Sequence, residues 1–310
     1  MKSGSGTGPK VIVISDKKVG LPFSKGILAS SISVTGLDIV TAYKIALDIQ
    51  EYLLSSKRYS ISLGELRSCA FRFIKDEVNL EYAEKYLLWQ SVGKLNKPIV
   101  VLIGGATGVG KSTIATILSN RLNITRIVST DAIREVMRAS VSDKLIRPLR
   151  GSSYNAYKNM ILPPSGVNPV LLGFREQVMA VIVGVEAIIR RSIEEKTDII
   201  IEGAHIVPGY LNIDKYLPDA IIQNFIISVP DRETHREHFS KRTFETQGSR
   251  PAQRYMKHMD EIRKIQNYIK KLAKENDIKV MNNYSLDNTI NKILELIFQR
   301  VKKEFSEVRL

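Results

Sequence analysis

The feature that most constrains this chain is a glycine-rich segment between an apolar run and a helical pattern. Residues 105–112 read Gly-Ala-Thr-Gly-Val-Gly-Lys-Ser and fit the pattern G-x-x-x-x-G-K-S. The segment follows the apolar run 99–103 and precedes the helical pattern 112–122, which is the context that this motif requires. Its glycines let the backbone N–H groups turn toward phosphate oxygens, and the helix N-terminus adds partial positive charge. The segment therefore predicts a loop that binds the phosphates of a nucleotide.

The residues of this predicted loop have distinct expected roles. Lys111 is expected to reach the β- and γ-phosphates, and the Ser112 hydroxyl is expected to bind Mg²⁺. A plain strand-to-helix turn is the alternative, and the Lys-Ser pair argues against it because the pair has no structural purpose there. The residues expected to bind the nucleotide are Gly105, Ala106, Thr107, Gly108, Val109, Gly110, Lys111, Ser112 and Thr113.

Further apolar runs predict a parallel sheet covered by helices. A strand without polar alternation is buried on both faces, and strands that alternate with helices imply right-handed crossovers. The predicted strands are 99–103, 124–129, 198–202, 221–229 and 279–282. The predicted helices between and after them are 112–122, 175–195, 233–244, 252–276 and 286–305. We therefore predict an α/β fold, a P-loop NTPase kinase domain.

Two acidic residues follow strands of this predicted sheet. Ligands bind beyond the carboxyl ends of such strands, so Asp131 is expected at the mouth of the site. A carboxylate there can accept a hydrogen bond from an acceptor hydroxyl and aim it at the γ-phosphate. The alternative, compatible with the first, is that Thr130 or Asp131 caps the next helix. Glu202 resembles a Walker B residue and is expected to hold Mg²⁺, through a bound water, together with Ser112, or to orient a substrate group. The alternative is a strand-end carboxylate without either role. His205 is expected to pack or form hydrogen bonds rather than act as a base.

A basic segment follows the fourth predicted strand. Residues 231–254 are typical of the lid of a small-molecule kinase, which closes over the transferring phosphate and excludes water. Arg236 and Arg242 are predicted to contact the nucleotide, and the other basic residues to be solvated. His235 and His238 are spaced three residues apart, and two histidines alone are weak grounds for a metal site.

The chain before the predicted sheet forms a separate unit in this interpretation. Residues 10–95 predict a short strand or hairpin followed by a small helical bundle, and the change to apolar strands near residue 96 marks the boundary. Residues 1–9 are rich in Gly, Ser and Thr and are expected to be flexible. Residues 96–310 are the predicted kinase domain. Capping residues of the bundle are Asp38, Ser62 and Asn79.

Composition narrows the compartment and the partners. Of the 310 residues, 44% are hydrophobic, a composition that excludes a wholly disordered chain. The net charge of +14 suits an anionic partner, which could be a nucleotide, a phosphorylated metabolite or a nucleic acid. The single cysteine, Cys69, lies in an apolar helical pattern and is expected to be a buried thiol. No apolar run reaches the ~18 residues of a membrane span. We expect a protein of the reducing cytoplasm, without a signal peptide.

Several segments, in this order, resemble the archaeal 2-phosphoglycerate kinase family over nearly the whole chain. Besides the phosphate loop, they are 21–28, 129–138, 152–154, 173–177, 202–209 and 260–266. The resemblance implies ATP-dependent phosphorylation of the 3-hydroxyl of 2-phosphoglycerate, giving 2,3-bisphosphoglycerate for the cyclic 2,3-diphosphoglycerate pathway. Residues 10–95 resemble an ATP-cone, a regulatory nucleotide-binding module. Its usual basic pair with Asp-Gly is replaced here by residues 15–20.

The resemblance implies an acceptor with three negative charges, and cations crowd the chain after Asp131. They are Arg134, Arg138, Arg147, Arg150 and Lys158. Arginine forks suit carboxylate and phosphate groups, and Arg134, then Arg150, is expected to bind the acceptor. The predicted catalytic residues are thus Lys111, Asp131 and Arg134. Within 147–151 the chain reads Arg-Pro-Leu-Arg-Gly, whereas the family tends to place a histidine just before the following Ser-Ser pair.

Three alternatives stay open at this point. The first is a polynucleotide or RNA kinase, which the net charge permits, although the chain lacks a basic run with interleaved aromatics. The second is a kinase of another phosphorylated hydroxy acid, suggested by the departure at 147–151. The third is a non-catalytic nucleotide sensor, against which the intact Lys111, Ser112 and Asp131 argue. The expected partner is a small anionic phosphorylated substrate, with no membrane; nucleic acid is disfavoured and homo-oligomerisation is left open.

Overall fold

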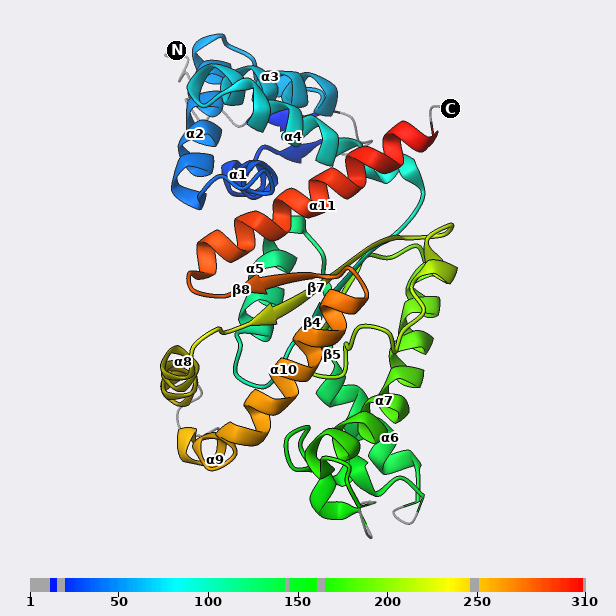
Figure 1. Cartoon of the computed structure of the whole chain (residues 1–310). Helices are drawn as coiled ribbons and strands as arrows, with labels where there is room; N and C mark the ends of the chain where they lie inside the picture. The colour runs from blue at the N-terminus through cyan, green and yellow to red at the C-terminus, as the bar shows by residue number, and fades with distance from the viewer. Residues whose placement is uncertain (1–11, 16–19, 143–144, 161–164, 246–250, 309–310) are drawn as a thin grey trace, which may run out of the picture. The chain divides into compact units, whose positions relative to one another are not determined.

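The computed structural model describes residues 12–15, 20–142, 145–160, 165–245 and 251–308, without the side chains of 242–245 and 308. The described residues fall into two compact units; Figure 1 labels their helices and several of their strands. The first unit holds the described residues up to Leu95, Arg121–Asn123 and the end of the chain from Leu294. The second holds Asn96–Asn120 and Ile124–Ile293. The predicted flexible segment 1–9 lies outside the described residues.

The first unit combines a small sheet with helices. Strand β1 pairs antiparallel with β2 and parallel with β3. The elements are β1 (Val13–Ile14), β2 (Leu21–Pro22), α1 (Lys25–Ser33), α2 (Ile39–Ser55), β3 (Ser60–Ile61), α3 (Leu63–Glu77), α4 (Leu80–Ser91) and the 3-10 turn η1 (Val92–Leu95). Asp38, Ser62 and Asn79 cap α2, α3 and α4 through their side chains, as predicted. Strand β3 was not predicted, because two residues are too few to leave a pattern.

The core of the first unit is made of the apolar faces of its helices. Ile45, Ile49 and Leu53 of α2 are fully buried, and the Cys69 thiol is buried among them, which raises its pKa. The chain's last helix contributes to this unit from Leu294 onward. There the Phe298 ring packs edge-on against Trp89, with centroids 5.8 Å apart. The apolar helical pattern around Cys69 thus correctly predicted a buried thiol.

The second unit is built on a five-stranded parallel sheet with the order β5-β6-β4-β7-β8. Its strands are β4 (Ile99–Gly104), β5 (Arg126–Ser129), β6 (Ile199–Gly203), β7 (Ile221–Ser228) and β8 (Lys279–Asn282). Every residue of β4 and β6 is buried, which explains the uninterrupted apolar sequence of β4 and the three isoleucines of β6. The predicted α/β fold is confirmed. Pairing of Ile103 with Glu202, and of Glu202 with Ser129, brings three strand ends to one edge.

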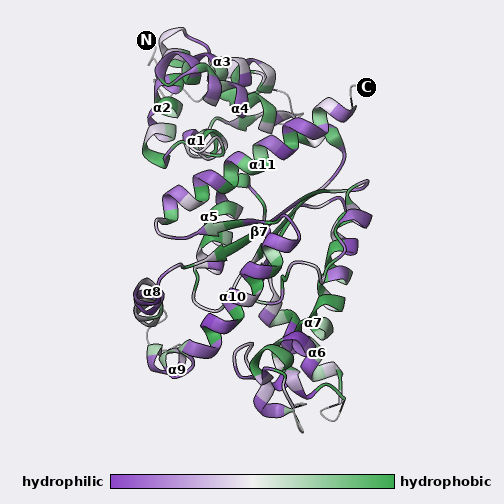
Figure 2. Cartoon of the chain, viewed as in Figure 1, coloured by the Kyte–Doolittle hydropathy of each residue, from purple (hydrophilic) through white to green (hydrophobic). Residues whose placement is uncertain are grey.

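Helices connect these strands. They are α5 (Lys111–Leu122), α6 (Thr130–Ser140), α7 (Pro169–Glu194), α8 (Arg232–Glu245), α9 (Ala252–Met256), α10 (Met259–Glu275) and α11 (Leu286–Val308). Short 3-10 turns are η2 (Arg147–Arg150), η3 (Ala156–Asn159) and η4 (Asp214–Tyr216). In Figure 2 the strands of the sheet are largely apolar, whereas α8 is largely hydrophilic. None of the described helices has the length and apolar character that crossing a bilayer demands.

The prediction of one helix over 252–276 was wrong. The chain forms α9 and α10, and His258 between them has φ −118° and ψ 20°, outside helical geometry. Ring contacts hold the break: Tyr255 stacks on Phe239 with centroids 4.9 Å apart, and His258 lies 5.0 Å from the Tyr154 ring. Partners distant in the sequence therefore decide where α10 begins.

Candidate active site

The segment 105–112 forms the predicted loop between β4 and α5. Gly105 and Gly110 have φ of 141° and 93°, a region that side chains rarely adopt. A Cβ at Gly105 would lie 2.3 Å from the Ile227 carbonyl oxygen, and one at Gly110 would lie 2.6 Å from Asn283 Nδ2. The two glycines are therefore required by both conformation and space, which is why the motif holds them.

Side chains from other elements bind the carbonyl oxygens of this loop. His235 Nε2 donates to Thr107 O at 2.8 Å, and His238 Nδ1 donates to Gly108 O at 3.2 Å. From beyond β8, Asn283 Nδ2 donates to Val109 O at 3.0 Å. These bonds hold the loop backbone in one conformation, so that its N–H groups are arranged before a nucleotide binds. Sequence reasoning missed this role for the two histidines and for Asn283, because each partner is more than 100 residues away.

Lys111, Ser112 and Glu202 lie together below the loop. Lys111 is buried, and its Nζ donates to Ala106 O at 2.7 Å. Ser112 Oγ donates to Glu202 Oε1 at 2.9 Å, so the structure brings the two predicted Mg²⁺ ligands into contact. A hydroxyl and a carboxylate are the hard oxygen donors that Mg²⁺ takes alongside phosphate oxygens, so the pair fits this ion. Within the described residues, no group of three or more His, Cys, Asp and Glu could hold a metal by itself.

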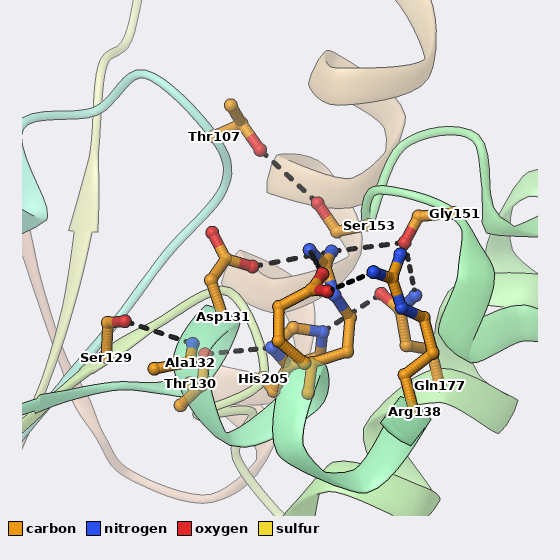
Figure 3. Close-up of polar contacts among 12 residues, drawn as sticks. Thr107, Ser129, Thr130, Asp131, Ala132, Arg138, Gly151, Ser153, Gln177 and His205 are labelled. Atoms are coloured by element: carbon orange, nitrogen blue, oxygen red, sulfur yellow. Dashed lines mark hydrogen bonds and ion pairs between the residues drawn. The ribbon is translucent and has the colours of Figure 1, made fainter.

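Asp131 stands in the first turn of α6. Ser129, rather than Thr130 or Asp131, caps this helix: its Oγ accepts a bond from the Ala132 N–H at 3.1 Å. The expectation that Thr130 or Asp131 is the cap was therefore wrong, because the helix starts one residue earlier. The Asp131 side chain is 70% exposed, and its Oδ1 lies 3.5 Å from Arg134 Nη1. Figure 3 shows the Asp131 carboxylate and its contact with the neighbouring guanidinium.

Arg134 points its guanidinium at the segment that follows α6. Its side chain is only 12% exposed, and Nη1 donates to Gly151 O at 3.1 Å. Nη2 donates to Glu135 Oε1 at 2.9 Å, while Nε is buried without a hydrogen-bond partner among the described residues. Of the other predicted cations, Arg138 pairs with Glu135 at 2.6 Å, and the rest (Arg147, Arg150 and Lys158) are exposed. The structure thus places Arg134 beside Asp131.

The segment after η2 also reaches the phosphate loop. The Thr107 and Ser153 hydroxyls lie 3.3 Å apart, as the dashed line in Figure 3 shows. The Gly151 carbonyl on the same segment accepts bonds from Arg134 and from Gln177 Nε2, the latter at 2.9 Å. The phosphate loop, Arg134 with its neighbour Asp131, and the segment after η2 are therefore linked at one edge of the sheet.

His205 follows β6 and is fully buried. Its Nδ1 lies 2.8 Å from Thr130 Oγ1, and its Nε2 lies 2.9 Å from Gln177 Oε1. Burial lowers its pKa to about 4, so the ring is neutral near pH 7. A neutral ring with both nitrogens hydrogen-bonded agrees with the expectation that His205 does not act as a base.

The predicted lid residues lie on α8. Arg236 is 45% exposed, and its Nη1 lies 3.3 Å from Glu233 Oε2. The side chain of Arg242 lies outside the described residues, so nucleotide contact by either arginine stays a prediction. The helix contacts the phosphate loop through His235, whose burial lowers its pKa to about 4, and through His238. Thr113 is exposed on the first turn of α5.

The fold and this edge define the class of protein. A G-x-x-x-x-G-K-S loop after the central strand of a parallel sheet, with a hydroxyl–carboxylate pair below it, is the nucleotide site of a P-loop phosphotransferase. No protein-family model matches the chain. The chain is 40% identical over 294 residues to the 2-phosphoglycerate kinase of Methanopyrus kandleri, covering 94% of this chain and 88% of the relative. It is 39% identical over 289 residues to that of Pyrococcus furiosus, covering 93% of each.

The chain belongs to the 2-phosphoglycerate kinase family. Among solved structures, it is similar to shikimate kinase from Acinetobacter baumannii in complex with shikimate, with 15% identity and a TM-score of 0.39. That alignment covers 67% of this chain and 97% of the other. The family assignment rests on the sequence relatives.

Proposed function

We propose that this protein transfers the γ-phosphoryl group of ATP to the 3-hydroxyl of 2-phosphoglycerate, giving ADP and 2,3-bisphosphoglycerate. Its relatives bear the name of this activity. The observation that carries the proposal is the position of Arg134, whose guanidinium contacts both Asp131 and the Gly151 carbonyl. Gly151 belongs to the segment after η2, and Ser153 of that segment contacts the phosphate loop. The acceptor, 2-phosphoglycerate, has a carboxylate and a phosphate beside one hydroxyl. An anionic group of this molecule suits Arg134, and its hydroxyl suits the carboxylate of Asp131 at the same edge of the sheet.

On the nucleotide side, the loop N–H groups and Lys111 bind the phosphates of ATP. Lys111 stabilises the negative charge that develops on the transferring group, and the loop's fixed conformation keeps that group in line with the acceptor. Ser112 and Glu202 would hold Mg²⁺, which when bound neutralises charge on the β- and γ-phosphates. The nucleotide site is thus supplied by the strand, the loop and the first turn of α5.

On the acceptor side, Asp131 orients the 3-hydroxyl and Arg134 binds an anionic group of the acceptor. The oxygen of the hydroxyl forms a bond to the γ-phosphorus as the bond to the β–γ bridging oxygen breaks. The hydroxyl proton passes to Asp131, and ADP leaves with the bridging oxygen. Since the transferring group is already electron-poor, positioning contributes more than basicity, which suits an exposed carboxylate.

Other parts of the chain complete the proposal. Helix α8, with Arg236 and Arg242, closes over the nucleotide and excludes water during transfer. The first unit acts as an ATP-cone-like regulatory module, and the enzyme works in the cytoplasm on a small phosphorylated acid. These roles extend the expectations drawn from the sequence.

Replacing Arg134 tests the acceptor assignment. We expect the wild-type protein to use 2-phosphoglycerate at least ~100-fold better than glycerate by kcat/KM, because a site built for the phosphate leaves cations unpaired when the phosphate is missing. Arg134→Ala is expected to narrow this ratio by about tenfold or more. The measurement is acceptor-dependent ADP release with each substrate.

The matched control is Arg138→Ala, which removes an exposed arginine one turn further along α6. The control is expected to keep the wild-type ratio. Equal ratios for Arg134→Ala and the wild type would remove Arg134 from the acceptor site.

A further inference from the structure

Three fully buried polar side chains form a continuous hydrogen-bonded chain beside residues 147–153, which we call the acceptor segment. They are Thr130 at the start of α6, His205 after β6 and Gln177 in α7. Thr130 Oγ1 lies 2.8 Å from His205 Nδ1, and Gln177 Oε1 lies 2.9 Å from His205 Nε2. Figure 3 shows the three side chains in this order beside Asp131 and Gly151. We call them the Thr130–His205–Gln177 relay.

The direction of each hydrogen bond in the relay follows from counting protons. Gln177 Nε2 donates to Pro148 O at 2.6 Å and to Gly151 O at 2.9 Å, which uses both protons of the amide. Gln177 Oε1 must therefore accept from His205 Nε2–H. Nδ1 of the neutral ring then lacks a proton and accepts from the Thr130 hydroxyl. One neutral tautomer satisfies every member, so the relay has a single arrangement.

Glycines stand at two backbone positions near the relay, where a side chain would collide with neighbouring atoms. Gly203 has φ 155°, and a Cβ there would lie 1.7 Å from Thr130 Oγ1. At the other end, a Cβ on Gly151 would lie 2.8 Å from Ala156 Cα, so this carbonyl sits in a closely packed turn. Neither position tolerates a larger residue in this conformation. The ends of β6 and η2 are therefore closely packed at the two ends of the relay.

The relay joins the two sides of the acceptor site. It begins at Thr130, next to Asp131, and ends on the carbonyls of Pro148 and Gly151. The Gly151 carbonyl also accepts a hydrogen bond from Arg134 Nη1 at 3.1 Å. A displacement of this carbonyl would therefore change the position of the Arg134 guanidinium. We propose that Thr130, His205 and Gln177 are positioning residues that fix the acceptor segment relative to Asp131. This proposal rests on the proposed function, because it assigns the acceptor to that edge.

The test uses an isosteric pair of substitutions at Thr130 in the full-length protein. Thr130→Val replaces the hydroxyl by a methyl group of similar size, whereas Thr130→Ser keeps the hydroxyl. We expect Thr130→Val to raise the KM for 2-phosphoglycerate about tenfold and to change the KM for ATP less than about twofold. Thr130→Ser is expected to keep both constants within about twofold of the wild type.

A second variant breaks the relay from its other end. Gln177→Met has similar length but offers neither proton to Pro148 and Gly151, and it is expected to give the same selective rise in the acceptor KM. ATP hydrolysis without acceptor is expected to stay at the wild-type rate in both variants, which a general loss of structure would not allow. This measurement decides the matter even if Thr130→Val proves unstable.

The outcomes separate the relay from the proposed function. If the wild type uses 2-phosphoglycerate but Thr130→Val and Gln177→Met leave its KM unchanged, or raise both KM values equally, the relay proposal is wrong. If the wild type does not use 2-phosphoglycerate, the proposed function is wrong. The same variants, measured with whichever acceptor the wild type phosphorylates, then support the relay by an acceptor-selective rise in KM or overturn it by its absence.

Discussion

Lys111→Ala is expected to lower kcat by at least ~10³-fold in a protein that still folds. The ammonium group stabilises charge on the transferring phosphoryl group, and nothing in an alanine replaces it. Alanine favours helical conformation, so the start of α5 is expected to persist. The measurement is acceptor-dependent ADP release, with thermal melting followed by circular dichroism to show that the variant is folded.

The control for this variant is Lys264→Ala, which removes an exposed lysine of α10 in the same unit. It is expected to retain wild-type turnover, which excludes an effect of net charge alone. Wild-type turnover by a folded Lys111→Ala protein would remove the phosphate-loop assignment.

Asp131→Asn is expected to lower kcat by about 100-fold or more, with the KM for ATP changed less than about twofold. The amide keeps the size of the carboxylate but has no negative charge, so it orients the 3-hydroxyl less firmly and cannot take its proton. The Asp131 side chain is 70% exposed and pairs with Arg134, whereas Ser112 and Glu202 bond to each other, so the nucleotide side should be spared. Steady-state kinetics with ATP and acceptor varied in turn give both constants.

Asp219→Asn, at an exposed position between η4 and β7, is the matched control and is expected to behave as the wild type. A collapse of ATP affinity in Asp131→Asn would place this carboxylate among the metal ligands and overturn its role toward the acceptor.

The sequence predicted those parts of the site that follow from strand ends. Segments rich in apolar residues located β4, β5, β6, β7 and β8, and the residues just beyond them had to meet at one edge because parallel strands end together. Asp131 and Glu202 were found in this way, whereas Lys111 and Ser112 were found from the glycine-rich motif. The contact between Ser112 and Glu202 is a direct consequence of β4 lying beside β6.

Contacts across the sequence were beyond such reasoning. Gln177 reads as one polar residue in the long helix α7, and only the fold shows that it is buried against carbonyls 26 and 29 residues away. His235 and His238 are likewise defined by carbonyls of a loop far upstream. The break before α10 depends on ring contacts rather than on a local breaker such as proline. The ATP-cone assignment of residues 10–95 and the domain boundaries stay predictions.

The acceptor specificity of the wild-type protein tests the central claim most directly. The purified protein with Mg-ATP is given 2-phosphoglycerate, glycerate, other phosphorylated hydroxy acids and RNA with a 5′ hydroxyl, and ADP release is measured against a reaction without acceptor. We predict that 2-phosphoglycerate gives the highest kcat/KM, at least ~100-fold above that of glycerate, and that RNA gives none. Efficient phosphorylation of RNA without phosphorylation of 2-phosphoglycerate would contradict the account.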